Sequence, residues 1–133
     1  MAINITQHSD SYSAAPQISV SDVAEIAQLG FKTIFNNRPD GEGGALQPTS
    51  EQIEAAAKKH GLDYVYIPII ASKISEQLST FNEAYEKAAK PVLGFCGKGY
   101  RAGVIFKSTR VEDANKRIQT SSKGIIAWLK NKL

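Results

Sequence analysis

The single cysteine of the chain lies in a glycine-rich segment that ends in an arginine. Residues 91–103 read PVLGFCGKGYRAG, in which Cys96 is followed by Gly97, Gly99 and Arg101. A glycine-rich turn after a strand lets backbone N–H groups converge on an anion, and the dipole of a following helix favours the same charge. This field favours the thiolate form of Cys96, which is the nucleophilic form of cysteine. The segment therefore predicts a nucleophilic site for a small anion.

Arg101 is expected to be the second catalytic residue, because a guanidinium clamps an oxyanion with two parallel hydrogen bonds. The other residues assigned to binding the substrate oxyanion are Gly97, Lys98, Gly99, Tyr100 and Ala102. Lys98 could add charge or point into solvent, and Tyr100 could face the pocket or pack. The structural alternative is a buried cysteine at a strand end, followed by an ordinary strand-to-helix turn. The position of Arg101 behind two glycines favours the functional interpretation.

A second polar loop, RPDGEGGALQP, follows the strand-like run FKTIFNN. Asn37, Arg38 and Asp40 are candidates to line the pocket, with Arg38 aiding anion binding or Asp40 acting as a remote acid. The alternative, favoured for each residue taken singly, is that Asn and Asp side chains hold their own loop backbone and Arg38 pairs with Asp40. Three glycines within residues 41–44 predict mobility, which would let this loop act as a lid.

The elements around these loops alternate between short apolar runs and helical stretches. This alternation is typical of an α/β domain with a central, largely parallel sheet flanked by helices. Strands are predicted over residues 31–37, 62–70 and 92–95. The wholly apolar run 92–95 is placed at the centre of the sheet, which puts Cys96 at its carboxyl end, where open α/β sheets bind ligands. No element is predicted for the N-terminal segment that contains His8.

Helices are predicted over residues 19–30, 49–61 and 75–90, from about Ala102 with a break near Ser108, and over 121–133. Thr49 and Gln52 form a capping box at the start of the second helix. The third helix has one apolar face, made of Leu78, Phe81, Tyr85 and Ala88. The last helix is expected to pack through Ile125, Trp128 and Leu129.

The length and composition set limits on the class of protein. The 133 residues predict a single domain over 1–133, and 42% hydrophobic with 22% charged residues are ordinary for a globular chain. The net charge of +3 is not gathered into a dense basic block, so no nucleic-acid partner is expected. No membrane span, signal segment or metal-ligand spacing is visible, which predicts a cytoplasmic protein with no metal and no cofactor. The oligomeric state stays open.

The Cys-x4-Arg loop resembles those of two enzyme families. Protein tyrosine phosphatases carry Cys-x5-Arg followed by Ser or Thr, and rhodanese sulfurtransferases carry a shorter loop that cradles a persulfide. Four stretches are more specifically similar to the phosphatase-like domain of bacterial beta-lactamase-hydrolase-like proteins: SAAPQIS, FKTIFNNRPDGE, QPTSEQIEAAAKKHGLDYVYIPI and the Cys96 loop. The resemblance runs from about Tyr12 to about Phe106. It implies a protein tyrosine phosphatase-like fold, with phosphatase and sulfur-transfer chemistry both proposed for such domains.

The sequence departs from the phosphatase pattern at points that bear on mechanism. Phe95 replaces the usual His, Ala102 stands where a Ser or Thr would assist the leaving thiolate, and the loop is one residue shorter. No Asp lies between Tyr64 and Cys96 to act as general acid. Phosphate ester hydrolysis requires protonation of a poor leaving group, a step worth about 10²–10⁴-fold. Sulfur transfer from thiosulfate releases sulfite and needs no acid.

We therefore expect a cysteine-thiolate enzyme that acts on a small anionic substrate, either thiosulfate or a persulfide, or a phosphate ester. Rhodanese-like sulfur transfer through a Cys96 persulfide is placed first, and phosphate monoester hydrolysis through a Cys96 phosphocysteine second. A non-catalytic oxyanion-binding module is the third possibility.

Overall fold

The protein is built on one five-stranded sheet with the order β1-β2-β5-β3-β4. The computed structural model describes the backbone of residues 3–132, with side chains described up to Ile118. The strands are β1 (Thr6–Ser9), β2 (Tyr12–Ala15), β3 (Thr33–Asn36), β4 (Asp63–Tyr66) and β5 (Val92–Phe95). β1 is antiparallel to β2, whereas the β2–β5, β3–β5 and β3–β4 pairs are parallel. The predicted largely parallel sheet is confirmed.

The central strand is β5, as its apolar sequence predicted. It lies between β2 and β3, with Gly94 opposite Ala14 on one side and Phe35 on the other. All four of its residues are buried, because the sheet is covered on both faces. Cys96 therefore follows the carboxyl end of the middle strand.

The described residues also form four α-helices and three short 3-10 helices, of which all but the last α-helix lie between strands. The α-helices are α1 (Val23–Gln28), α2 (Ser50–Lys59), α3 (Ile74–Lys87) and α4 (Tyr100–Lys132), and the 3-10 helices are η1 (Val20–Asp22), η2 (Gly44–Leu46) and η3 (Ala71–Lys73). The predicted capping box of α2 is present: the Gln52 N–H donates to Thr49 Oγ1 at 3.1 Å, and the Thr49 N–H donates to Gln52 Oε1 at 2.9 Å. It satisfies two N–H groups that the helix leaves without partners.

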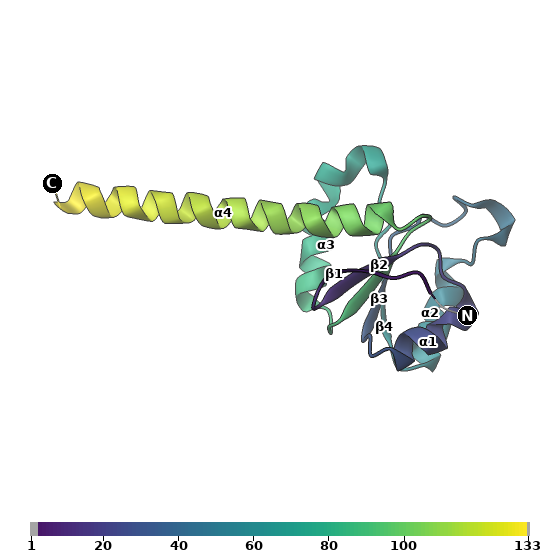
Figure 1. Ribbon diagram of the computed structural model, residues 1–133. Coiled ribbons are helices and arrows are strands. Elements are labelled where there is room, and N and C mark those ends of the chain that lie inside the picture. The colour runs from purple at the N-terminus through teal and green to yellow at the C-terminus, as the bar shows by residue number, and fades with distance from the viewer. Residues whose placement is uncertain (1–2, 133) are drawn as a thin grey trace.

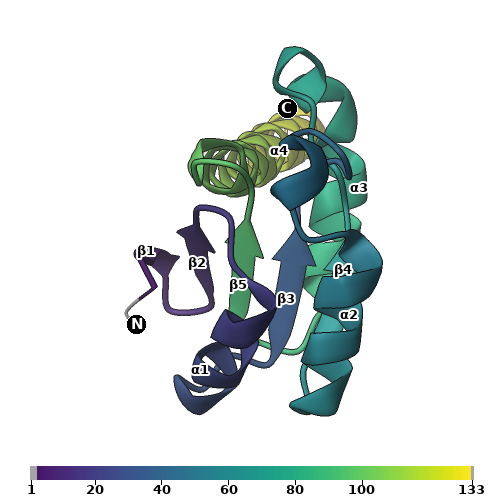
Figure 2. The ribbon, with the colours of Figure 1, turned by 90° about the vertical axis from the view of Figure 1, so that its right-hand side faces the viewer.

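The helices cover the two faces of the sheet in pairs, with α1 and α2 on one side and α3 and α4 on the other (Figure 2). Successive residues of a strand point to opposite faces, so Ile34 belongs to the α1–α2 core and Phe35 to the α3–α4 core. The predicted apolar face of α3 is confirmed, since Phe81 and Tyr85 are buried in that second core.

Two sequence predictions need correction. The N-terminal segment forms the β1–β2 hairpin, with Tyr12 of β2 opposite Val92 of β5, although no strand was predicted there. α4 is a single helix that starts at Tyr100 and passes Ser108 without a break. The hydroxyl of Thr109 donates to the Phe106 carbonyl within the helix at 2.7 Å, so such side chains are accommodated without ending it.

Beyond its contacts with α3, α4 continues away from the sheet (Figure 1). The packing predicted for its C-terminal apolar residues concerns positions outside the described side chains. Among the helices described, none combines the length and apolar character that crossing a membrane requires.

Candidate active site

The Cys96 loop is anchored by backbone hydrogen bonds that extend the sheet past the end of β5. The Cys96 N–H donates to the Ala15 carbonyl at 3.3 Å, and the Gln17 N–H donates to the Gly97 carbonyl at 3.1 Å. Gly99 adopts φ +93°, and a Cβ atom there would lie 3.3 Å from the Ala15 carbonyl carbon. The loop therefore requires glycine at position 99, both for its backbone conformation and for its close approach to β2.

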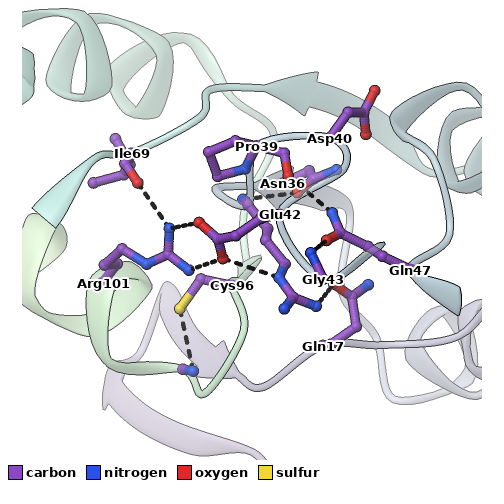
Figure 3. A network of polar contacts seen from close by, with 12 residues as sticks. Gln17, Asn36, Pro39, Asp40, Glu42, Gly43, Gln47, Ile69, Cys96 and Arg101 are labelled. Carbon is purple, nitrogen blue, oxygen red and sulfur yellow. Dashed lines mark hydrogen bonds and ion pairs between the residues drawn. The ribbon is translucent and has the colours of Figure 1, made fainter. Parts of the chain in front are cut away.

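The sulfur of Cys96 faces this loop. The Gly99 N–H donates to Cys96 Sγ at 3.1 Å (Figure 3). The guanidinium of Arg101 lies close enough for Cys96 to contribute to the raised pKa of Arg101, although Glu42 is its main cause. Only 1% of Cys96 is exposed, so the sulfur is closed off from solvent in this conformation. The loop thus places the thiol against a backbone amide and near a guanidinium, and it also buries the thiol.

The carboxylate of Glu42 occupies the space between two arginines beside the loop (Figure 3). Its Oε1 accepts from Arg101 Nη2 at 2.6 Å and from Arg38 Nε at 3.1 Å, and its Oε2 accepts from Arg101 Nη1 at 2.8 Å. These hydrogen bonds, first from Arg101 and then from Arg38, hold the pKa of Glu42 below its usual value. Glu42 is therefore ionised at neutral pH and is held as an anion, not as a proton donor.

Arg38 is fixed from several sides. Its backbone N–H donates to Asn36 Oδ1 at 2.9 Å, and its Nη1 donates to Gln17 Oε1 at 3.1 Å. The guanidinium packs over Gly43, where a Cβ atom would lie 2.8 Å from Arg38 Nη2. Arg38 thus reaches the Cys96 loop from the β3–α2 connection, and Glu42 joins it to Arg101.

Asp40 forms hydrogen bonds that hold its own loop, and the prediction that it pairs with Arg38 is wrong. Its Oδ1 accepts from the Ser50 N–H at 2.7 Å, and its own N–H donates to the Tyr66 hydroxyl at 2.8 Å. These bonds hold Asp40 at the start of α2, and Arg38 pairs with Glu42 instead. Asn37 is fully buried, and its Nδ2 donates to the Ile67 carbonyl at 2.9 Å, so it positions the loop after β3.

The loop that carries Glu42 is braced. Gln47 Oε1 accepts from the Gly43 N–H at 2.6 Å, and Gln47 Nε2 donates to the Pro39 carbonyl at 2.9 Å. Gly41 and Gly44 both have φ +80°. Through the bonds of Glu42 to Arg101, the loop that carries Glu42 lies beside the Cys96 loop, in the position expected of a lid. Its movement stays a prediction.

The remaining predicted residues of the Cys96 loop differ in exposure. Lys98 is exposed, and 75% of Tyr100 is exposed at the start of α4. Ala102 is buried, and its carbonyl accepts from the Tyr12 hydroxyl at 2.8 Å. A Cβ atom on Gly97 would lie 3.4 Å from Arg38 Nε and 3.5 Å from Arg101 Nη2. The open position above Gly97 is therefore flanked by both guanidiniums.

Tyr12 of β2 supports the loop from within the α3–α4 core, to which Cys96 also belongs. Its hydroxyl lies where a side chain on Gly94 would stand, which explains the glycine in the central strand. Burial, with a smaller contribution from Cys96, raises the pKa of Tyr12 well above its usual value, so the phenol stays neutral. Tyr12 was not predicted as part of the site.

Together these residues hold one carboxylate between two guanidiniums, beside a thiol. The Glu42 carboxylate presents two oxygens to Arg101, as an oxyanion would. Sequence reasoning missed Glu42 because it considered Asp40 as the acid of this loop and, apart from that, only the segment from Tyr64 to Cys96. The sequence does offer one signal for Glu42. It lies in the RPDGE loop, and this loop follows a strand that ends at the same edge of the sheet as β5.

The chain matches a known protein family over most of its length. A family model described as beta-lactamase hydrolase-like protein, phosphatase-like domain, matches residues 4–112. The beta-lactamase hydrolase-like protein of Agrobacterium fabrum is 35% identical over 108 residues, which is 80% of this chain and 24% of that protein. The chain thus spans about a quarter of the length of the curated relatives that it matches.

Solved structures agree on the fold. The structure of a candidate phosphatase from Neisseria meningitidis is similar with a TM-score of 0.73 and 30% identity, over 87% of each chain. Tk-PTP in its active form has a TM-score of 0.50 and 18% identity, over 71% of this chain and 63% of that one, which bears on the fold alone. The chain has the mixed α/β fold of protein tyrosine phosphatase-like proteins.

Proposed function

The chain belongs to the phosphatase-like domain family of beta-lactamase hydrolase-like proteins, and from this premise we propose that it is a cysteine-dependent sulfurtransferase. The observation that carries the proposal is the pairing of Glu42 with both Arg38 and Arg101. This pairing supports an anion site beside Cys96. It also leaves the carboxylate at that site ionised.

In the proposed reaction the anionic end of thiosulfate replaces the Glu42 carboxylate between the two guanidiniums. The Cys96 thiolate attacks the outer sulfur of thiosulfate and forms a new sulfur–sulfur bond. The sulfur–sulfur bond of thiosulfate breaks, and its electron pair leaves with sulfite. The products are a Cys96 persulfide anion and sulfite, so charge and electrons balance without a proton donor or an oxidant. A thiolate acceptor then attacks the outer persulfide sulfur and regenerates the Cys96 thiolate.

Sulfur transfer is placed before phosphate hydrolysis because the described residues offer no protonated acid beside Cys96 and Arg101. Among the described residues, Glu42 is the only carboxylate that forms an ion pair with Arg101. Its lowered pKa makes it a weak source of protons near neutral pH. A phosphate monoester with a poor leaving group needs such a source, whereas sulfite leaves as a stable anion.

Phosphate monoester hydrolysis is the second candidate, and it rests on the similarity to the candidate phosphatase of N. meningitidis. Here Cys96 would attack phosphorus, and a phosphocysteine would form as the alcohol leaves. Two arginines beside one nucleophile suit a phosphoryl group as well as thiosulfate. A non-catalytic oxyanion-binding module would use the same guanidiniums without turnover.

The deciding experiment for sulfur transfer is intact-mass spectrometry of the protein after incubation with thiosulfate. The proposal predicts an adduct of about 32 Da on Cys96 that a thiol reductant removes. The Cys96→Ser variant should stay unmodified. No adduct on the wild-type protein, or an equal adduct on Cys96→Ser, contradicts sulfur transfer through this residue.

The phosphatase alternative is tested in parallel with p-nitrophenyl phosphate. It predicts turnover that disappears in Cys96→Ser and falls sharply in Arg101→Ala, because the guanidinium stabilises the charge that develops on the phosphoryl oxygens. If neither thiosulfate nor the phosphate ester reacts while sulfate still binds equally well to Cys96→Ala, the binding-module hypothesis is favoured.

A further inference from the structure

A second pocket lies on the other side of the Cys96 loop, toward β1 and β2. It has a volume of about 350 Å³ and is formed by β1, the end of β2, the loop residues 98–100 and the first turns of α4. Neither Cys96 nor Arg101 lines it. Figure 2 shows β1 and β2 beside the start of α4 at this edge of the sheet. The pocket is thus separate from the anion site between the two arginines, although it shares the backbone of the loop.

The charged residues of this pocket are cationic. Lys98 and Lys107 line it, and no aspartate or glutamate does. Neither lysine forms an ion pair with a carboxylate among the described residues. Two exposed ammonium groups at the rim of one hollow favour an anionic ligand.

His8 forms one wall of the pocket, and a glycine in α4 makes room for it. A Cβ atom on Gly103 would lie 2.8 Å from His8 Nε2, so the imidazole packs directly on the helix backbone. Glycine inside a helix costs about 0.5–1 kcal/mol relative to alanine. The close approach of His8 to α4 is a physical reason for Gly103, and it places a titratable ring beside Lys107.

The other walls combine polar and apolar side chains, because Asn4 and Thr6 line the pocket on the side of β1. Ala14, Ala15 and Pro16 line the inner side, and Val104, which is 42% exposed, lines the helix side. Tyr100, which is 75% exposed, stands at the rim. Apolar side chains beside a few charged and polar groups suit a small organic anion, whereas an inorganic ion gains nothing from the apolar part of the lining.

We propose that this pocket binds a small organic carboxylate, with its charged group held by Lys98 and Lys107 and its carbon body against Ala14, Pro16 and Val104. Ammonium groups attract the carboxylate, and the apolar walls discriminate in favour of ligands with a hydrocarbon part. The proposal holds whether Cys96 transfers sulfur, hydrolyses phosphate esters or does neither. Because the pocket shares residues 98–100 with the Cys96 loop, its ligand would contact the loop from behind.

His8 offers a direct measurement of binding. Burial first, and then the charge of Lys107, lower the pKa of His8. Its other titratable neighbour, Tyr12, lies 6.4 Å away between ring centroids and stays neutral because burial raises its own pKa. A carboxylate bound beside Lys107 adds a negative charge that favours the imidazolium form, so the pKa of His8 must rise on binding.

The experiment is an NMR titration of the two histidine side chains in the full chain, with and without saturating benzoate. Benzamide serves as the matched ligand that has the same ring and no charge. Benzoate is expected to raise the pKa of His8 by about 0.5–1 unit, a value reduced from that of a buried pair because the pocket is open to solvent. Benzamide should leave it unchanged. The His60 signal, from the exposed C-terminal end of α2, is the internal control and should not respond to benzoate.

Two variants separate this pocket from the arginine site. Lys107→Gln should weaken benzoate binding at least several-fold, whereas Lys87→Gln, which removes another exposed lysine, on α3, should not. Arg101→Ala should keep the His8 response. No change in the pKa of His8 with benzoate, an equal change with benzamide, or a response that survives Lys107→Gln and is lost in Arg101→Ala would each overturn the proposal.

Discussion

Removing the carboxylate of Glu42 should strengthen oxyanion binding beside Cys96. Glu42 forms ion pairs with Arg38 at 3.1 Å and Arg101 at 2.6 Å, and an incoming oxyanion must replace both. The side chains of Arg38, Arg101 and Glu42 keep 19%, 18% and 35% of their surface exposed. Each ion pair is therefore worth at most about 1 kcal/mol. Together they oppose the incoming anion by about 1–2 kcal/mol, which corresponds to about 5–30-fold in affinity.

The assay is calorimetric titration of sulfate into the wild-type protein, Glu42→Gln and Glu42→Ala at neutral pH and low ionic strength. Both variants should bind sulfate about 5–30-fold more tightly than the wild type. Glu54→Gln is the matched control, because it removes an exposed carboxylate whose partner is Lys58 on α2, away from the site. It should leave sulfate affinity unchanged. High salt should reduce the difference between Glu42→Gln and the wild type, since these charges are only partly buried.

Two results would refute this reasoning. If the Glu42 variants bind sulfate no better than the wild type, the carboxylate does not compete for the guanidiniums. If Glu42→Gln binds sulfate more tightly but loses turnover of phenyl phosphate, whose leaving group is poor, while Glu54→Gln keeps that turnover, Glu42 donates a proton after it is displaced. The second outcome would restore the phosphatase hypothesis as the better one.

Three further predictions follow from the geometry. The pKa of Glu42 in the folded protein is lowered, so its ion pairs are present above the usual carboxyl pKa of 4.5 and are lost as the pH falls through the lowered pKa. The sulfate affinities of the wild type and Glu42→Gln, measured against pH, should therefore become equal below that lowered pKa. Gly30→Ala, at φ +97° with open space around it, should lower the free energy of unfolding by about 1–2 kcal/mol and keep the Cys96 reaction. Gly99→Ala, at φ +93° against the backbone of β2, should lower the free energy of unfolding further, as measured by urea titration, and abolish the thiosulfate adduct. Gly94→Ala should destabilise the protein by about 1–3 kcal/mol or more, and a double-mutant cycle with Tyr12→Phe should recover part of that loss, because the Tyr12 hydroxyl is the atom that the new methyl would overlap.

The parts of the fold that were predicted from sequence are those with local signals. The apolar run of β5, the Thr49 capping box and the periodic apolar residues of α3 each carry their own evidence within a few residues. The β1–β2 hairpin carries little, because Thr6–Ser9 is polar and largely exposed and Tyr12–Ala15 contains two small alanines. Its strand character comes from pairing with β5, some 80 residues later in the chain, which no short pattern records.

The same distinction holds for the site. Cys96 and Arg101 share one loop, so their proximity follows from sequence spacing and the glycines between them. Glu42 lies 59 residues from Arg101, and its position depends on how Gln47 and Tyr66 fold the intervening loop. Nearness in sequence misled in the case of Arg38 and Asp40, because the start of α2 offered Asp40 a backbone partner.

The charge balance at the arginines narrows the class of substrate that can enter. Arg38 and Arg101 together carry two positive charges, and Glu42 neutralises one of them. A monoanion that displaces Glu42 only exchanges one negative charge for another, so it gains little at the guanidiniums and still has to release a carboxylate that is already well placed. A dianion such as thiosulfate or a phosphate monoester neutralises both arginines and gains the second charge as additional attraction. We therefore expect Glu42 to act as an internal competitor that selects for dianions, a property that both proposed chemistries would use.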